Sequence, residues 1–166
     1  AALLLLDGMR YIYQQLDQKN NQIAVVSLEK TKIEKERNEL VQKNKTIETN
    51  LAVIIDPNNT VVTLVGQTVS PESSAKVYWN KETQSVYVDA SGLAEPPKGM
   101  VYQVWSLKLN PLTPTSIGLL DQFKDNTEHF FEVSKTAEAE AFEITLEPTG
   151  GSITPTIEQL YTLGKV

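Results

Sequence analysis

Few residues of this chain could carry catalytic chemistry. The sequence has no cysteine and a single histidine, His129. The absence of cysteine excludes disulfide bonds and thiolate metal sites. A serine triad or a copper site would have to use His129 without the partners it needs. We therefore interpret His129, which precedes Phe130 and Phe131 in an expected strand, as structural, and predict no catalytic residue, no metal ligand and no cofactor.

Glu143 and Glu147 form the one carboxylate pair that could be considered as acid and base. Residues four apart in a strand share a face but lie about 13 Å apart at the backbone, more than carboxylates acting on a sugar usually allow. We interpret Glu147 instead as an acceptor for N–H groups of the turn that follows it. Gly150 and Gly151 in that turn offer no phosphate site, because no lysine follows them.

Other classes of ligand find little support in the sequence. The net charge of −6 argues against a nucleic-acid partner, because such a surface needs basic residues to displace counterions from phosphates. Exposed aromatic residues could form a platform for a peptide or glycan, although nothing in the sequence singles out a pocket. The candidates for such a platform are Tyr78, Trp79, Tyr87, Tyr102 and Trp105.

About eight short strands are predicted after the turn-forming segment Asp56–Asn59. They alternate apolar and polar residues and are separated by Pro, Gly and Asn clusters. The expected strands are 61–65, 75–80, 85–90, 101–109, 117–120, 129–133, 141–146 and 159–163. Strands of this number and length suggest an antiparallel β-sandwich of about 110 residues. Within strand 101–109, we expect the face with Trp105 to line the core and Tyr102 to lie on the opposite face.

The segment from Asp7 to about Ile55 is predicted to be one long helix, because it lacks proline and is rich in good helix formers. One heptad frame holds throughout, which favours a coiled coil. Its d positions are Ile12, Lys19, Val26, Ile33, Leu40, Ile47 and Ile54, and its a positions are Leu16, Ile23, Lys30, Arg37, Asn44 and Leu51. The polar a residues predict a weak association, and Asn44 favours a parallel pair. A helix that lies partly on its own β domain is the alternative.

Two motifs in the β segment carry a family resemblance. Strand 141–146 runs into a stretch of the form T-x-E-P-x-G-G-S-x-x-P-T, and G-x-x-Y-Q-x-W precedes it. Over residues 58–166 this pattern resembles the C-terminal domain of the anti-sigma-K factor (RskA) family. The matching positions are Gly99, Tyr102, Gln103, Trp105, Gly118, Thr145, Glu147, Pro148, Gly150, Gly151, Pro155 and Thr156. The chain departs from the family at Ile157, where a glycine is often found.

The resemblance implies a membrane-anchored anti-sigma factor of bacteria. In such proteins a cytoplasmic segment, which is not among these residues, holds an extracytoplasmic-function sigma factor inactive until an envelope protease cuts the protein. We expect residues 1–57 to form a juxtamembrane stalk and residues 58–166 a periplasmic β-sandwich. The apolar run Ala1–Leu6 would be the outer end of the single membrane span, although a helix start would explain it as well. The alternative function is a stand-alone envelope module for ligand binding or adhesion.

Overall fold

The computed structural model describes residues 2–166, with side chains from Leu6 onward. It contains one helix, eight strands and a short 3-10 turn. The chain divides into two compact units, residues 1–49 and 50–166, which are described separately. The predicted boundary between residues 57 and 58 stays a prediction.

Helix α1 (Ala2–Ile55) confirms the predicted long helix. Its exposed surface carries i,i+4 ion pairs, among them Lys30–Glu34 at 3.9 Å, of the kind that adds modest stability to isolated helices. The helix ends where predicted, because Pro57 restricts the residue before it. Asn59 then closes the end of the helix, because its side-chain amide donates to the Val53 carbonyl at 2.7 Å.

No helix among residues 2–166 combines the length and apolar character needed to cross a membrane. The expected membrane edge at Ala1–Leu6 lies almost wholly outside the described side chains. The structure therefore leaves that expectation as a prediction.

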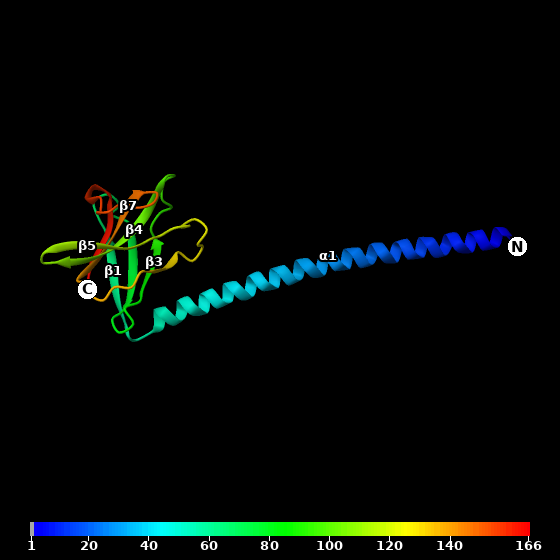
Figure 1. The fold of residues 1–166 in the computed structure, drawn as a ribbon, viewed down its shortest axis with the longest axis horizontal. Coiled ribbons are helices and arrows are strands. Elements are labelled where there is room, and N and C mark those ends of the chain that lie inside the picture. Colours follow the sequence, from blue (N-terminus) through cyan, green and yellow to red (C-terminus); the bar gives the residue numbers. More distant parts are fainter. Residues whose placement is uncertain (1) are drawn as a thin grey trace. The chain divides into compact units, whose positions relative to one another are not determined.

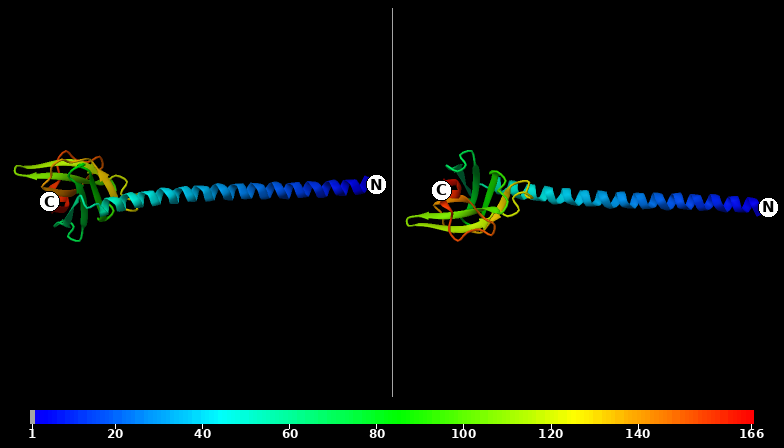
Figure 2. Two further views of the ribbon diagram at one scale, coloured as in Figure 1. Left: turned by 90° about the horizontal axis from the view of Figure 1, so that it is seen from below. Right: turned by 90° about the horizontal axis from the view of Figure 1, so that it is seen from above.

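The β domain contains all the strands that the alternating pattern predicted (Figure 1). Their bounds are β1 (Asn59–Gly66), β2 (Ser74–Asn80), β3 (Val86–Gly92), β4 (Met100–Leu109), β5 (Leu112–Leu119), β6 (Phe130–Val133), β7 (Ala141–Pro148) and β8 (Leu160–Lys165), with a 3-10 turn η1 (Ile157–Gln159) before the last. The expected hairpin is β2–β3, which pairs antiparallel. The β4–β5 hairpin extends beyond the rest of the sheet in both views of Figure 2.

The eight strands form one antiparallel sheet rather than two. The strand order is β5-β4-β7-β8-β1-β2-β3-β6. The sheet curls until its two edge strands approach each other, and the Ser134 N–H, just after β6, donates to the Ile117 carbonyl of β5 at 2.7 Å. The predicted sandwich of separate sheets is therefore not confirmed, because curling lets one continuous sheet surround its own core.

Strands β4 and β7 are buried on both faces, which corrects the predicted orientation of β4. The inward face, with Tyr102 and Val104, belongs to the main core. Trp105 lies on the outward face in a smaller cluster with Leu107 and Ala141. Both Tyr102 and Trp105 are almost fully buried, at 1% and 0% exposed. Alternation along the strand could not tell the faces apart, because both carry large apolar residues.

Candidate functional site

The outward face of β4 and β7 brings much of the family motif together. The antiparallel register places Gln103 opposite Thr145 and Val101 opposite Glu147. All of these residues are less than a tenth exposed, because the segment after β7 folds back over them. That segment, residues 149–159, includes η1, which lies against β7.

Glu147 is the centre of the polar contacts under this segment. It is fully buried and accepts three hydrogen bonds from the turn. The donors are the Ser152 hydroxyl at 2.7 Å, the Thr156 N–H at 2.8 Å and the Thr156 hydroxyl at 2.7 Å. A buried carboxylate with this many donors fixes the path of the loop, since leaving any one unpaired would be costly.

Gln103 holds the same loop from the neighbouring strand. Its side-chain carbonyl accepts the Ser152 N–H at 2.8 Å, and its amide donates to the Ser152 carbonyl at 3.0 Å. The amide also donates to the Ser116 hydroxyl of β5 at 2.7 Å. Gln103 thus ties the loop to two strands. We call Gln103, Thr145, Glu147, Ser152 and Thr156 the motif clasp.

Trp105 extends the clasp through its indole N–H, which donates to the Thr145 hydroxyl at 2.9 Å. Thr145 is fully buried and shares this face of β7 with Glu147, whose pKa its hydroxyl helps to lower. The buried Trp105 indole N–H and the buried Glu147 carboxylate therefore each have hydrogen-bond partners, as buried polar groups require.

The two glutamates of β7 have opposite electrostatic surroundings. Burial alone would raise the pKa of Glu147, but hydrogen bonds from Thr145, Ser152 and Thr156 outweigh it and lower that pKa below its ordinary value. Burial raises the pKa of Glu143, which has no side-chain hydrogen bond among the described residues. The pKa values of two carboxylates on the same face of one strand are therefore shifted in opposite directions by their surroundings.

Glycines fit the motif to this geometry at two places. Gly151 has φ of +79°, and a Cβ added there would lie 2.8 Å from both the Gln103 Oε1 and a Leu119 methyl carbon. Gly118 lies where the sheet edges meet, and its added Cβ would be 3.0 Å from a Val133 methyl carbon. Any side chain would strain the clasp at the first position and separate the edge strands at the second.

The remaining motif residues lie around the clasp or away from it. Tyr102 faces the main core and donates its hydroxyl to the Ala94 carbonyl at 3.0 Å. The Gly99 carbonyl accepts the Thr149 N–H at 2.9 Å, so Gly99 contacts the start of the segment 149–159. Pro148 ends β7 opposite Met100, and Pro155 is half-buried in the loop. Gly150 has φ of +98° next to the clasp.

His129 lies outside the clasp, just before β6. Its ring stacks on Phe123 with centroids 4.4 Å apart, and its backbone has a positive φ of 47°. Of the aromatic residues considered for a platform, Tyr78, Trp79, Tyr102 and Trp105 are buried in the domain, and Tyr87 is half-buried. These contacts give His129 a packing role in the turn before β6.

Sequence reasoning missed Ser152 as a clasp member. It bonds both Gln103 and Glu147, which lie on different strands. Its position directly after Gly150–Gly151, five residues beyond Glu147, was the available signal. With every oxygen of the Glu147 carboxylate engaged, the clasp is suited to holding structure rather than to proton transfer.

Comparison with known families decides the assignment. The family model described as "Anti-sigma-K factor rskA, C-terminal" matches residues 2–160, nearly the whole chain. The chain belongs to this anti-sigma factor family. The match includes α1 as well as the β domain, whereas the sequence motifs pointed only to residues 58–166. The family is regulatory rather than enzymatic and implies a sigma factor as partner. Neither the curated proteins nor the solved structures yielded a match.

Proposed function

We propose that this chain is the extracytoplasmic region of a single-pass, membrane-anchored anti-sigma factor that controls an extracytoplasmic-function sigma factor. The observation that carries the proposal is the family match over both α1 and the β domain. None of the described residues is assigned to sigma-factor binding, which would belong to a cytoplasmic segment.

In this proposal α1 is a stalk that pairs weakly with a second copy. Its apolar seam is open to water: Ile23 is 67% exposed, Ile33 57% and Leu40 63%. A parallel coiled coil would bury such a seam. The polar a residues Lys30 and Arg37 interrupt it, so we expect the pair to be weak in solution and firmer on a membrane, where effective concentration rises.

The stalk is also where we expect an envelope protease to act. Lys19, Asn20 and Asn21 interrupt the apolar seam in the helix before Ile23. A poorly packed helix frays more readily, and proteases bind extended, locally unfolded chain. We propose that the β domain limits this cleavage, either sterically or by stabilising the paired stalk, so that a signal received outside the cell releases the sigma factor inside.

The location can be tested with cysteine labelling, because the described chain has no cysteine of its own. We propose replacing the exposed residue Glu128 by cysteine in the full-length protein and treating intact cells with a membrane-impermeant maleimide. An extracytoplasmic domain is labelled without lysis. Labelling that appears only after lysis, while a known external cysteine protein is labelled in intact cells, would contradict this location.

A further inference from the structure

One end of the curled sheet carries a hollow of about 380 Å³ that the anti-sigma function does not use. Its volume falls in the range of small-ligand sites. The end of β2, the turn after it, the β4–β5 turn and the segment before β7 contribute its wall. We call it the rim hollow, and its lining is Trp79, Lys81, Lys108, Asn110, Ala137, Glu138, Ala139 and Glu140.

Trp79 forms a fixed inner wall of the rim hollow. The residue is only 3% exposed, and its ring meets Phe142 edge-on, with centroids 5.7 Å apart. Its indole N–H donates to the Thr136 carbonyl at 3.0 Å. The tryptophan therefore separates the core from the hollow and forms a fixed apolar floor, of which only a small part is exposed.

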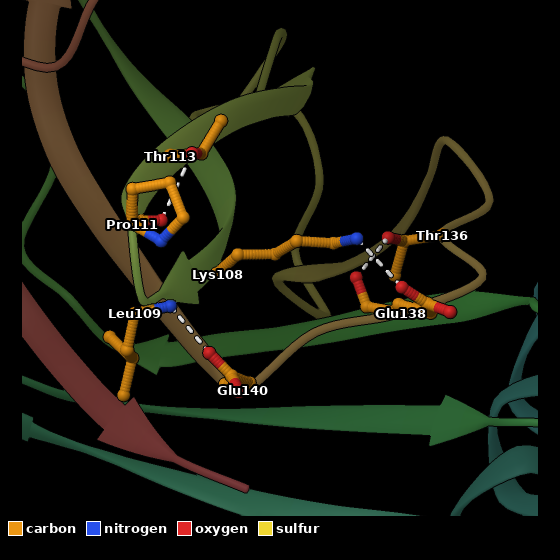
Figure 3. Close-up of polar contacts among 7 residues, drawn as sticks. All are labelled: Lys108, Leu109, Pro111, Thr113, Thr136, Glu138 and Glu140. Atoms are coloured by element: carbon orange, nitrogen blue, oxygen red, sulfur yellow. Dashed lines mark hydrogen bonds and ion pairs between the residues drawn. The ribbon is translucent and has the colours of Figure 1, made fainter.

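The segment that closes the hollow is also held in place. The Thr136 N–H donates to the Gln84 carbonyl at 3.0 Å, and the Glu140 N–H donates to the Leu107 carbonyl at 2.8 Å. The Thr136 hydroxyl donates to the Glu138 carbonyl at 3.3 Å, as Figure 3 shows. The hollow is thus preformed, which lowers the entropy cost of binding.

Most charges around the hollow already have partners within the protein. Figure 3 shows the Lys108 ammonium directed at the Glu138 carboxylate, with an N–O distance of 2.7 Å. The Glu140 carboxylate accepts the Leu109 N–H. Lys81 differs from them: its ammonium lies 5.1 Å from the centroid of the Trp79 ring and forms no ion pair with a described carboxylate.

We propose that the rim hollow binds a small carboxylate, which Lys81 holds while the rest of the ligand lies against Trp79, Ala137 and Ala139. The Trp79 ring does not neutralise the Lys81 ammonium as a carboxylate would, and a wall that excludes part of the water strengthens the attraction between that ammonium and an anion. Lys108 offsets the charge of Glu138, and Asn110 adds an amide donor to the wall. A peptide C-terminus and an acidic sugar both carry the required group.

The test titrates the full chain with two pairs of probes and follows the Trp79 indole N–H signal by NMR. The pairs are N-acetyl-alanyl-alanine with its amide, and galacturonic acid with its methyl ester. We expect at least one acid to shift the signal with a dissociation constant on the order of 1 mM, and its neutral partner to have no saturable effect. Whichever acid binds identifies the source of the carboxylate. The Trp105 signal, from the clasp face, should not move.

Lys81→Gln should weaken that binding at least about tenfold. Lys76→Gln is the matched control, since Lys76 is another exposed lysine of the β2 region and lies outside the rim hollow; it should bind as the parent does. The proposal is overturned if neutral and acidic probes bind equally, if Lys81→Gln binds as well as the parent, or if no probe gives a saturable shift up to on the order of 50 mM.

Discussion

Two fully buried threonines in adjacent strands have opposite polar surroundings. The Thr145 hydroxyl of β7 accepts the Trp105 indole N–H, whereas the Thr162 hydroxyl of β8 has no hydrogen-bond partner in the described chain. A buried hydroxyl without a hydrogen-bond partner lowers the free energy of unfolding, whereas one with a partner can raise it. The sequence could not separate these two residues, because each is a threonine in an alternating strand.

We therefore predict opposite effects for the same substitution. Thr162→Val should raise the free energy of unfolding by about 1 kcal/mol, because it removes an unsatisfied hydroxyl at little change in volume. Thr145→Val should lower it by about 1–3 kcal/mol, because the Trp105 N–H loses its acceptor. Urea denaturation of both variants provides the measurement. Changes of the same sign would show that the two polar environments are wrongly described.

The two glutamates of β7 give the pH prediction. Burial raises the pKa of Glu143. The protonated side chain therefore contributes stability at a pH below the ordinary pKa of glutamate, and this stability is lost as the pH rises through the raised pKa. The pKa of Glu147 is lowered. The ionised side chain therefore contributes stability at a pH above the ordinary pKa of glutamate, and this stability is lost as the pH falls through the lowered pKa.

At pH 7, Glu143→Gln should therefore stabilise the domain, with a gain that shrinks toward acid pH. Glu147→Gln should destabilise it at pH 7 by about 1.5–3 kcal/mol, since a charged acceptor is lost, and less at acid pH. Denaturation midpoints measured between about pH 2.5 and pH 8 test both, because the Glu147 contribution is lost only below the ordinary pKa of 4.5. A Glu147→Gln variant as stable as the parent at pH 7 would argue against the clasp.

At the scale of elements, the sequence predicted which helix and strands exist better than which face of a strand is buried or how the sheet closes. All eight strands and the helix end at Ile55 follow from periodicity and turn residues, but β5 begins at Leu112 rather than at the predicted residue 117. The inward face of β4 did not, because Tyr102 and Trp105 are equally suited to burial and a second layer covers the outward side. Nor did the single curled sheet, because strand alternation is the same in a sandwich and in a closed sheet.

The stalk helix gives the prediction at this scale. Replacing Lys30 and Arg37 by leucine should tighten self-association at least about tenfold, because both fall on the a positions of the apolar seam. Lys32 and Lys35 are the matched control, since they form similar exposed ion pairs on other faces of the helix. Sedimentation velocity over a concentration series measures the change. Two results would contradict the prediction that this seam pairs: no self-association in either the parent or the variant, or equally tightened self-association when Lys32 and Lys35 are replaced instead.

The whole molecule contains an exposed helical seam and a domain whose family motif stabilises its structure. The clasp holds the loop after β7 through Gln103 and Glu147 and leaves no free group for catalysis there. The motif thus predicted the family, confirmed by the match to residues 2–160, but its residues act by fixing a fold. Any regulatory role must then come from what the domain covers, binds or stabilises.

Deleting residues 58–166 from the full-length protein tests the central claim most directly. If the β domain restrains cleavage of the stalk, the deletion should raise both stalk cleavage and sigma-dependent transcription without any stimulus. Immunoblotting of the stalk and a transcriptional reporter measure the two effects, and removal of the cytoplasmic segment serves as the positive control for derepression. Unchanged cleavage and transcription in the deletion, with derepression in the control, would contradict the account.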